Sequence, residues 1–228
     1  ASPVVREIQN VLTVRRGALL TFGAVAALWF ASNGVEALRT ALGALAATLG
    51  PATVLVNNAA RDDRHNWKDV TPDYYDERMA TNLRHMFFAI QAVAPGMIEA
   101  GGGSIINMGS NSWWEAGGGF PVYATAKAAV HGLTRTMARD LGDHRIRVNT
   151  VVPGWIMTER QKELWATPEG LEKHRARQCL PDLIDPVYVA RMVVFLASDD
   201  AGYITGQTIY ADGGRLALNY TVPVPEEE

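Results

Sequence analysis

The sequence predicts an α/β fold with a doubly wound parallel sheet, and three observations support this prediction. From about residue 35 onward, short apolar runs alternate with helix-forming stretches. Polar or glycine-bearing residues gather where three of the apolar runs end, at 57–58, 107–112 and 153–154. Hydrophobic residues make up 48% of the 228-residue chain and charged residues 20%, which suffices for a large core inside a solvated surface. Alternating strands and helices imply parallel crossovers, and open sheets of this kind bind ligands at the carboxyl ends of their strands.

An uncharged apolar stretch at residues 18–31 is the first candidate element. It is shorter than the roughly 18–20 apolar residues that a membrane span needs, so we expect a buried element of the core. A secretory signal is the alternative, because two arginines precede the stretch. A helix is expected over 35–49, where Gly50-Pro51 provides a stop signal.

The later elements alternate in the same way. Thr71-Pro72-Asp73 opens a long helical stretch that runs to about Ala100, and Pro95 is expected to kink or interrupt it. Short apolar runs predict buried strands, and longer periodic stretches predict helices. We expect strands over 53–56, 104–108, 147–152 and 207–211, and helices from about 121 to 141 and over 186–198.

Composition narrows the possible functions and the domain organisation. A net charge of -3 and a pI near 6.0 give no electrostatic basis for nucleic-acid binding. The single cysteine, Cys179, excludes an internal disulfide, argues against a structural metal site and fits a reducing, cytoplasmic location. No linker-like segment divides the chain, so we expect an atypical segment at 1–34, one domain over 35–220 and an acidic tail at 221–228.

Tyr123 and Lys127 are the most informative pair of residues in the chain. In a helix, positions i and i+4 share a face, so the phenol and the ammonium project into the same space. A nearby ammonium favours phenolate, so we expect a Tyr123 pKa below the usual value of about 10. Ser110, thirteen residues earlier, could hold a substrate oxygen while the proton moves. A surface tyrosine and lysine on an amphipathic helix is the alternative interpretation of this spacing.

Six short motifs, which follow one another along the chain, resemble those of a known protein family. They are NNAA at 57–60, TNL around Asn82, GSIIN followed by Ser110, YATAK at 123–127, RVNTVVPGWIMT at 147–158 and ITGQTIYADGG at 204–214. Over about residues 35–215 the sequence resembles the short-chain dehydrogenase/reductase family, which implies a Rossmann-like sheet and an NAD- or NADP-dependent oxidoreductase. The resemblance implies a catalytic set of Asn82, Ser110, Tyr123 and Lys127.

The family roles can be placed on these residues. Tyr123 would act as the base on a substrate hydroxyl, Ser110 would orient the substrate oxygen, and Asn82 would anchor a water that links Lys127 to solvent. Lys127 would also hold the nicotinamide ribose. Among the remaining residues implied at the cofactor, Asn57 and Ala59 belong to the turn near the adenosine ribose, where Asn57 would stabilise the mouth of the sheet. Pro153, Gly154 and Ile156 would flank the nicotinamide carboxamide, and Thr158 could hydrogen-bond that amide or the diphosphate.

The segments AARDDRHNW (59–67), NLRHMFFAIQAVAPGM (82–97) and PGWIMTERQ resemble bacterial aldose 1-dehydrogenases within this family. Those enzymes oxidise the anomeric hydroxyl of pentoses, galactose or fucose to a lactone. An aromatic side chain would pack on the sugar ring while polar groups bind its hydroxyls. The candidate substrate residues are Ser112, Trp113, Trp155, Arg64 and His65. The tryptophans could equally be core or interface residues, and Arg64 and His65 a solvated loop or a subunit contact.

The N-terminal region departs from the family pattern. The family needs a glycine-rich turn after its first strand, TGxxxGxG, where the backbone approaches the pyrophosphate. Gly17, Gly23 and Gly34 have the wrong spacing for it, and residues 1–34 are too few for the family's first three strands. Residues 18–24 could be a remnant first strand. We therefore expect a first βαβ portion that is shortened or replaced, through lineage divergence, a truncated gene or a damaged reading frame.

Two functional hypotheses follow. The first is an NAD(P)-dependent sugar dehydrogenase that acts on a small-molecule substrate as a homodimer or homotetramer. The second is a relative that binds cofactor poorly or not at all and acts as an oligomeric partner. Neither hypothesis involves nucleic acid or a membrane, and the choice between NAD and NADP stays open.

Overall fold

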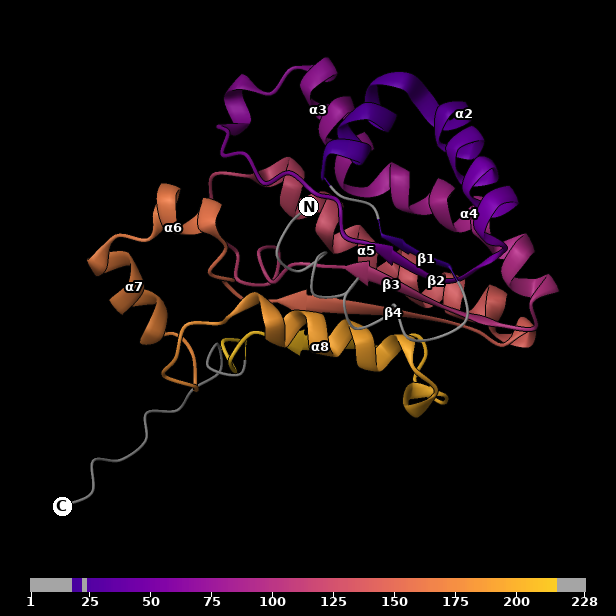
Figure 1. Cartoon of the computed structure of the whole chain (residues 1–228). Coiled ribbons are helices and arrows are strands. Elements are labelled where there is room, and N and C mark those ends of the chain that lie inside the picture. Colours follow the sequence, from indigo (N-terminus) through magenta and orange to yellow (C-terminus); the bar gives the residue numbers. More distant parts are fainter. Residues whose placement is uncertain (1–17, 22–23, 217–228) are drawn as a thin grey trace.

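The computed structural model describes residues 18–21 and 24–216. Its centre is a parallel sheet with the strand order β1-β2-β3-β4-β5. The strands are β1 (Ala18–Thr21), β2 (Ala52–Asn57), β3 (Gly103–Met108), β4 (Ile146–Pro153) and β5 (Thr208–Ala211). Helices cover both faces of this sheet (Figure 1), so the predicted α/β class with a parallel sheet is confirmed.

One face of the sheet packs against α2 (Ala24–Leu49), α4 (His85–Glu99) and α5 (Pro121–Leu141). Leu55 and Ile105 point to this face and are fully buried with helix residues such as Ile90. Successive strand residues point to opposite faces, so Val56 and Ile106 lie in the other core cluster. The continuous apolar runs of the sequence are therefore explained by strands that are buried on both sides.

The opposite face packs against α8 (Pro186–Ala197), which Figure 1 shows beneath β3 and β4. Asp185 caps this helix by accepting a hydrogen bond from the Val187 amide, and Pro186 occupies the first turn. Val189, Val193 and Leu196 recur at helical spacing and fill the second core cluster.

Two predictions about the N-terminal part have clear outcomes. The remnant strand proposed within 18–24 is present as β1, which pairs in parallel with β2. The helix expected over 35–49 begins earlier, at Ala24. Among the described residues, no helix is both long and apolar enough to cross a membrane. The acidic tail at 221–228 lies outside the described residues.

The helical stretch predicted over 71–100 is divided, although not where we expected. It consists of α3 (Pro72–Met79), the π-helical turn η2 (Ala80–Arg84) and α4. The expectation that Pro95 interrupts the helix is wrong, because α4 continues to Glu99 and its buried face there offsets one lost backbone hydrogen bond. The kink expected as the alternative stays a prediction. The break falls instead at the π-helical turn around Asn82, a geometry that is frequent at functional sites.

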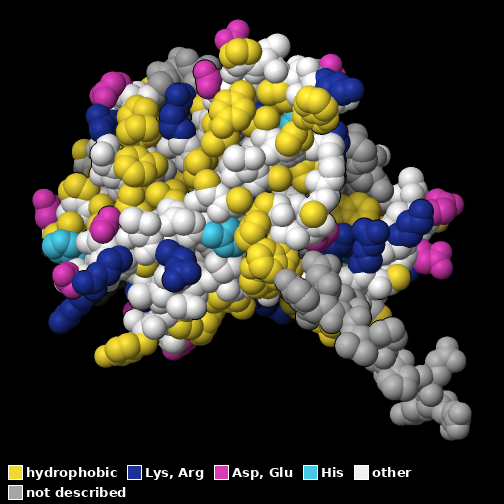
Figure 2. All heavy atoms as spheres, turned by 180° about the vertical axis from the view of Figure 1, so that it is seen from behind, with side chains coloured by type: hydrophobic (Ala, Val, Ile, Leu, Met, Phe, Trp, Pro, Cys, Tyr) yellow, Lys and Arg dark blue, Asp and Glu magenta, His cyan; other side chains and the backbone are white. Residues whose placement is uncertain are grey.

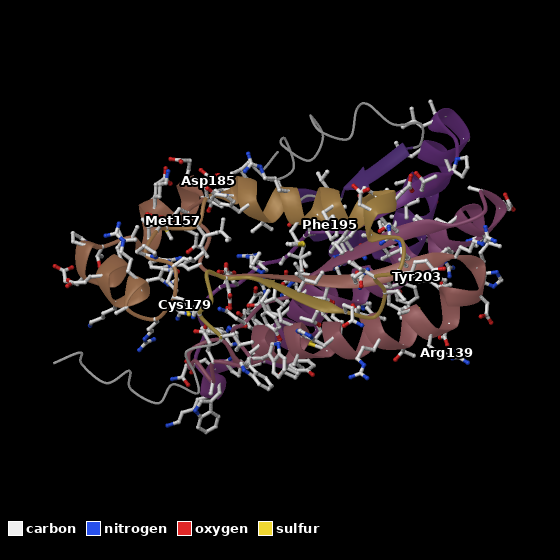
Figure 3. All side chains as sticks on the ribbon, turned by 90° about the horizontal axis from the view of Figure 1, so that it is seen from below. Arg139, Met157, Cys179, Asp185, Phe195 and Tyr203 are labelled. Carbon is white, nitrogen blue, oxygen red and sulfur yellow. The ribbon has the colours of Figure 1, made fainter. Side chains whose placement is uncertain are left out.

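Between β4 and α8 the chain forms an arm of two short helices, α6 (Glu159–Trp165) and α7 (Pro168–Arg175). Figure 1 shows this arm projecting beyond one end of the sheet. In Figure 3, Met157 and Cys179 lie near the arm, whereas Tyr203 lies at the opposite end of the sheet. Met157 follows β4 and Tyr203 precedes β5, so the arm stands at the carboxyl ends of the strands. Three short helical turns complete the structure: η1 (Trp67–Asp69), η3 (Gly142–His144) and η4 (Asp199–Ala201).

Candidate active site

A cavity of about 610 Å³ opens at the carboxyl ends of β2, β3 and β4, beside the α6–α7 arm. This is where a parallel open sheet is expected to bind its ligand. The cavity brings together many of the residues singled out in the sequence, which are Ser110, Ser112, Tyr123, Arg64, Trp155, Pro153, Gly154, Ile156 and Thr158.

Lys127 and Tyr123 lie one turn apart on α5, as the sequence predicts. The Lys127 side chain is buried, and its Nζ donates a 2.8 Å hydrogen bond to the Met108 carbonyl oxygen at the end of β3. The same Nζ lies 5.8 Å from the centroid of the Tyr123 ring. Burial lowers the pKa of Lys127 to about 8, because desolvation penalises the ammonium.

The Tyr123 pKa shifts in the direction opposite to our expectation. Burial raises it to about 12, and this effect outweighs the hydrogen bond with Ser110, which lowers it. The carboxylate of Asp62 adds to the rise, and Arg64 opposes it. The predicted net lowering by Lys127 is therefore wrong for the protein without a bound cofactor. In this state the phenol is held as a proton donor.

Ser110 follows β3 and faces the phenol. Its Oγ lies 3.0 Å from the Ser112 Oγ and accepts a 3.1 Å hydrogen bond from the Ser112 amide. These bonds orient the Ser110 hydroxyl, which also bonds to Tyr123. The hydroxyl groups of Ser110 and Tyr123 can therefore approach the same substrate oxygen.

Asn82 is fully buried in the π-helical turn. Its Nδ2 donates to the carbonyl oxygens of Arg78 and Arg61, at 2.9 and 3.1 Å, and its Oδ1 accepts a 2.8 Å bond from the Arg61 amide. Both amide protons are used in this way, so the side chain fixes the loop that follows β2. The predicted water relay to Lys127 stays a prediction.

Asn57 lies deeper than the cavity wall, at the end of β2. Its Nδ2 donates a 2.8 Å bond to Oδ1 of Asn107, and Nδ2 of Asn107 donates a 2.9 Å bond to Thr134. Asn57, Asn107 and Thr150 are in register across three strands. This buried polar row holds the strand ends to α5. Ala59 is also buried and lies next to Ala60, which lines the cavity.

Two candidate substrate residues lie outside the cavity lining. The His65 ring accepts a 3.2 Å hydrogen bond from the Val122 amide and lies 2.9 Å from the Tyr74 hydroxyl. Trp113 donates from Nε1 to Nε2 of His131 at 3.2 Å. Both side chains tie loops at the cavity to α3 or α5.

The other three candidates line the cavity. The Arg64 guanidinium lies 4.1 Å from the centroid of the Phe120 ring. The Trp155 ring meets His174 edge to face at 4.9 Å and donates a 2.7 Å bond from Nε1 to Oε1 of Gln161. Trp155 therefore presents an apolar surface that is locked in place. Ser112 stands beside Ser110, as described above.

The cavity wall also carries a charged group that the sequence does not predict. Glu115, His174 and Arg215 line the cavity, and Arg215 contacts both of the other two side chains. Glu115 and Arg215 are 100 positions apart in the chain. No local periodicity or motif connects them, so only the folded chain reveals the group.

The nicotinamide half of a dinucleotide fits the residues at this site. The buried ammonium of Lys127 has three donors, yet among the described residues the Met108 carbonyl is its one hydrogen-bond acceptor. Ribose hydroxyls could satisfy the other donors. Where the diphosphate would lie, the sequence offers a single glycine, Gly23, between β1 and α2.

Comparisons with known proteins agree with this architecture. A family model described as enoyl-(acyl carrier protein) reductase matches residues 31–215. D-xylose 1-dehydrogenase of Caulobacter vibrioides is 52% identical over 174 residues, which cover 76% of this chain and 70% of that protein. L-rhamnose 1-dehydrogenase (NAD(P)(+)) of a Sphingomonas species is 39% identical over 168 residues, 73% of this chain and 66% of the relative.

A solved structure supports the same assignment. Gluconate 5-dehydrogenase from Burkholderia cenocepacia, in complex with NADP and tartrate, superposes with a TM-score of 0.82 at 26% identity, over 94% of this chain and 91% of that one. The family match, the relatives and the Ser110–Tyr123–Lys127 geometry all agree. The chain therefore belongs to the short-chain dehydrogenase/reductase family, the NAD(P)-dependent oxidoreductases that act on CH–OH groups.

Proposed function

We propose that the protein oxidises the anomeric hydroxyl of an aldose to the lactone, with NAD or NADP as the hydride acceptor. The observation that carries this proposal is the convergence of Ser110 and Tyr123 on one wall of the 610 Å³ cavity, next to buried Lys127. A cavity of this size accommodates a monosaccharide together with a nicotinamide ring.

In the proposed reaction, Ser110 and Tyr123 hydrogen-bond the anomeric oxygen. The Tyr123 phenol first releases its own proton to solvent. The resulting phenolate then takes the hydroxyl proton, and the C–H electron pair leaves the same carbon as hydride, so the C–O bond becomes the carbonyl of the lactone. The dinucleotide, when bound, supplies the ring that accepts the hydride and a positive charge that favours phenolate. Lys127 would assist because its ammonium lies beside the phenol.

Lys127 and Tyr123 would hold the nicotinamide ribose. Pro153, Gly154, Ile156 and Thr158 would surround the carboxamide, because these four residues line the cavity at the end of β4. Asn57 and Ala59, which are buried behind the cavity lining, would support the part of the cavity that holds the adenosine ribose. Gly154 is suited to the strand end: an added Cβ would lie 2.8 Å from Cα of Asp212, so any side chain there would push β4 and β5 apart.

An aldose is favoured over other alcohols by the cavity lining and by the relatives. Trp155 offers a fixed apolar surface for a sugar ring, and Ser112, Asn111 and Gln161 offer polar groups for its hydroxyls. The D-xylose and L-rhamnose 1-dehydrogenases named above support oxidation at the anomeric carbon. We further propose a homo-oligomeric assembly and, from the single cysteine, a cytoplasmic location.

The test is a melting scan of the purified protein with NAD and NADP, followed by an aldose panel read at the absorbance of the reduced nicotinamide. A ligand that binds only the folded state raises the melting temperature, so we expect a shift with at least one dinucleotide and turnover of a pentose or hexose. Tyr123→Phe should keep most of the shift, because Lys127 still holds the ribose, but lose turnover by a factor of at least 100. Equal turnover in Tyr123→Phe would remove the phenol from the base role.

The second candidate is a relative that does not bind dinucleotide and acts as an oligomeric partner. The single glycine between β1 and α2 favours it, because the phosphate turn of the family is built from several. Absence of a thermal shift with either dinucleotide, in a folded oligomer, would support this candidate against the first.

A further inference from the structure

A charged cluster closes one side of the cavity. Glu115 comes from the loop after β3, His174 from α7, and Arg215 from the turn after β5. The Arg215 and Glu115 side chains are 14% and 20% exposed, so the pair is largely shielded from water. All three residues line the same cavity as Ser110 and Tyr123.

Every nitrogen of the Arg215 guanidinium has a protein partner. Nε and one terminal nitrogen donate to the two carboxylate oxygens of Glu115, at 2.5 and 2.8 Å. This is the bidentate geometry in which an arginine binds a carboxylate most specifically. The other terminal nitrogen lies 2.6 Å from Nδ1 of His174.

The protonation state of His174 is consistent with its contact with Arg215. Burial, with a contribution from the Arg215 charge, lowers the pKa of His174 to about 4. The ring is therefore neutral near pH 7, and its Nδ1 can accept a hydrogen bond from Arg215. Asn111 also donates to Glu115 from its side-chain amide. The cluster thus carries one positive and one negative charge that cancel.

The turn that carries Arg215 is fixed independently. The carboxylate of buried Asp212 accepts hydrogen bonds from the amides of Gly214 and Leu216, both at 2.9 Å, on either side of Arg215. The backbone that carries Arg215 is therefore held by contacts other than those of Glu115.

We propose that Glu115 is a specificity-determining residue that restricts the cavity to uncharged aldoses. By occupying Arg215, Glu115 prevents the guanidinium from binding a carboxylate of the ligand, and its own charge repels one. Uronic acids, which carry a carboxylate where a hexose carries a hydroxymethyl group, are thereby excluded. This inference rests on the proposed function, because it assumes an aldose in the cavity.

The test measures binding rather than turnover. Isothermal titration of D-galactose and D-galacturonate, which share their ring stereochemistry, is performed on the protein with the reduced dinucleotide bound, so that no oxidation occurs. We expect the parent to prefer galactose. Glu115→Gln keeps an oxygen for Arg215 but removes the negative charge, so the affinity ratio should move toward galacturonate by at least tenfold. Since screening weakens charge interactions, added salt should reduce this gain.

Two further variants test whether the change in the affinity ratio comes from Arg215 or from the loss of any negative charge. Glu159→Gln removes the same charge from an exposed position on α6, where the carboxylate pairs with Lys162, and should leave the ratio unchanged. Glu115→Gln combined with Arg215→Gln removes both charges and should return the ratio to the parent value. If Glu115→Gln fails to fold, Arg215→Gln alone should disfavour galacturonate further, since it leaves Glu115 unpaired.

The outcomes distinguish the inference from the proposed function. A parent that binds galactose, with an unchanged ratio in folded Glu115→Gln, overturns the inference alone. A gain that persists in the double variant also overturns it, because Arg215 would then not be the group that binds the carboxylate. A parent that binds neither sugar although it oxidises a pentose of the aldose panel also overturns the inference alone. A parent that binds neither sugar and oxidises no aldose of the panel overturns the proposed function and the inference together.

Discussion

The buried ammonium of Lys127 is needed for the proposed reaction but destabilises the folded protein. Its ammonium is buried, with one carbonyl acceptor from Met108, and its pKa falls from 10.5 to about 8. Below pH 8 the folded protein carries a charge that it solvates poorly. Natural active sites commonly tolerate such costs, since the group is needed for the reaction.

We therefore expect Lys127→Met to stabilise the cofactor-free protein while it abolishes turnover. Each pH unit by which the pKa is lowered corresponds to roughly 1.4 kcal/mol, so the gain at pH 7 should be on the order of 2–3 kcal/mol after the lost hydrogen bond is subtracted. Between about pH 8 and 10.5 the unfolded parent binds more protons than the folded parent, so the stability of the parent rises with pH.

The difference in the free energy of unfolding between Lys127→Met and the parent should accordingly shrink as the pH is raised from 7 to 9.5. Urea unfolding of both proteins at the two pH values measures this difference. A constant difference between the two proteins would contradict a lowered pKa at Lys127.

At the scale of elements, the α6–α7 arm is held to the end of β5 by a short backbone latch. The amides of Cys179 and Leu180 both donate to the Gly213 carbonyl oxygen, at 2.9 and 3.0 Å. Gly214 packs directly against Cys179, because a Cβ on this glycine would lie 2.8 Å from Cβ and Sγ of Cys179. The latch connects the arm, which carries His174, to the turn that carries Arg215.

Gly214→Ala should open this latch. The φ angle of Gly214 is +82°, a region that alanine adopts only with strain, and the added methyl group would collide with Cys179. We expect a loss of about 1–3 kcal/mol in the free energy of unfolding and a higher KM for the sugar, because the cavity wall shifts. Chemical denaturation and steady-state kinetics measure the two effects.

Gly43→Ala is the matched control within the same chain. Gly43 lies in α2, and an added Cβ would meet nothing within 4 Å. Alanine should stabilise this helix by up to about 1 kcal/mol. Glycine to alanine should therefore lower the free energy of unfolding at position 214 and raise it at position 43. Destabilisation at both positions would argue against the latch.

At the scale of the whole molecule, apolar side chains gather between scattered charges on the face shown in Figure 2. Independently of that view, the exposed large residues of the described helices include Phe87 and Ile98 on α4 and Tyr75 on α3, each about 40% exposed. Surfaces of this kind commonly mark contacts between protein chains. They support the proposed homo-oligomer.

We expect the purified chain of 24.8 kDa to elute at two or four times its mass in size-exclusion chromatography with light scattering. Phe87→Glu should shift the peak toward the monomer, because an acidic side chain is costly in an apolar interface. Leu49→Glu is the control, a similar change at an exposed position near the end of α2. A parent that elutes as a monomer at micromolar concentration would contradict the assembly.

Comparison of sequence and structure shows where local information suffices. The strands expected at 53–56, 104–108, 147–152 and 207–211 all appear within a residue or two of their predicted bounds. Continuous apolar runs with flanking turn residues identify such strands without reference to the rest of the chain. The π-helical turn at Asn82 was not predicted, because its sequence is compatible with an ordinary helix and Pro95 gave a stronger, misleading signal.

The sequence by itself determined the α/β alternation, the gathering of polar residues at the strand ends, and the pairing of Tyr123 with Lys127 on one helix face. These features depend on periodicity and on short spacings, which are local properties. Only the tertiary structure decided the direction of the Tyr123 pKa shift and the Glu115–Arg215 pair on the cavity wall. Both depend on burial and on contacts between segments far apart in the chain, which are set when the sheet and its helices pack together.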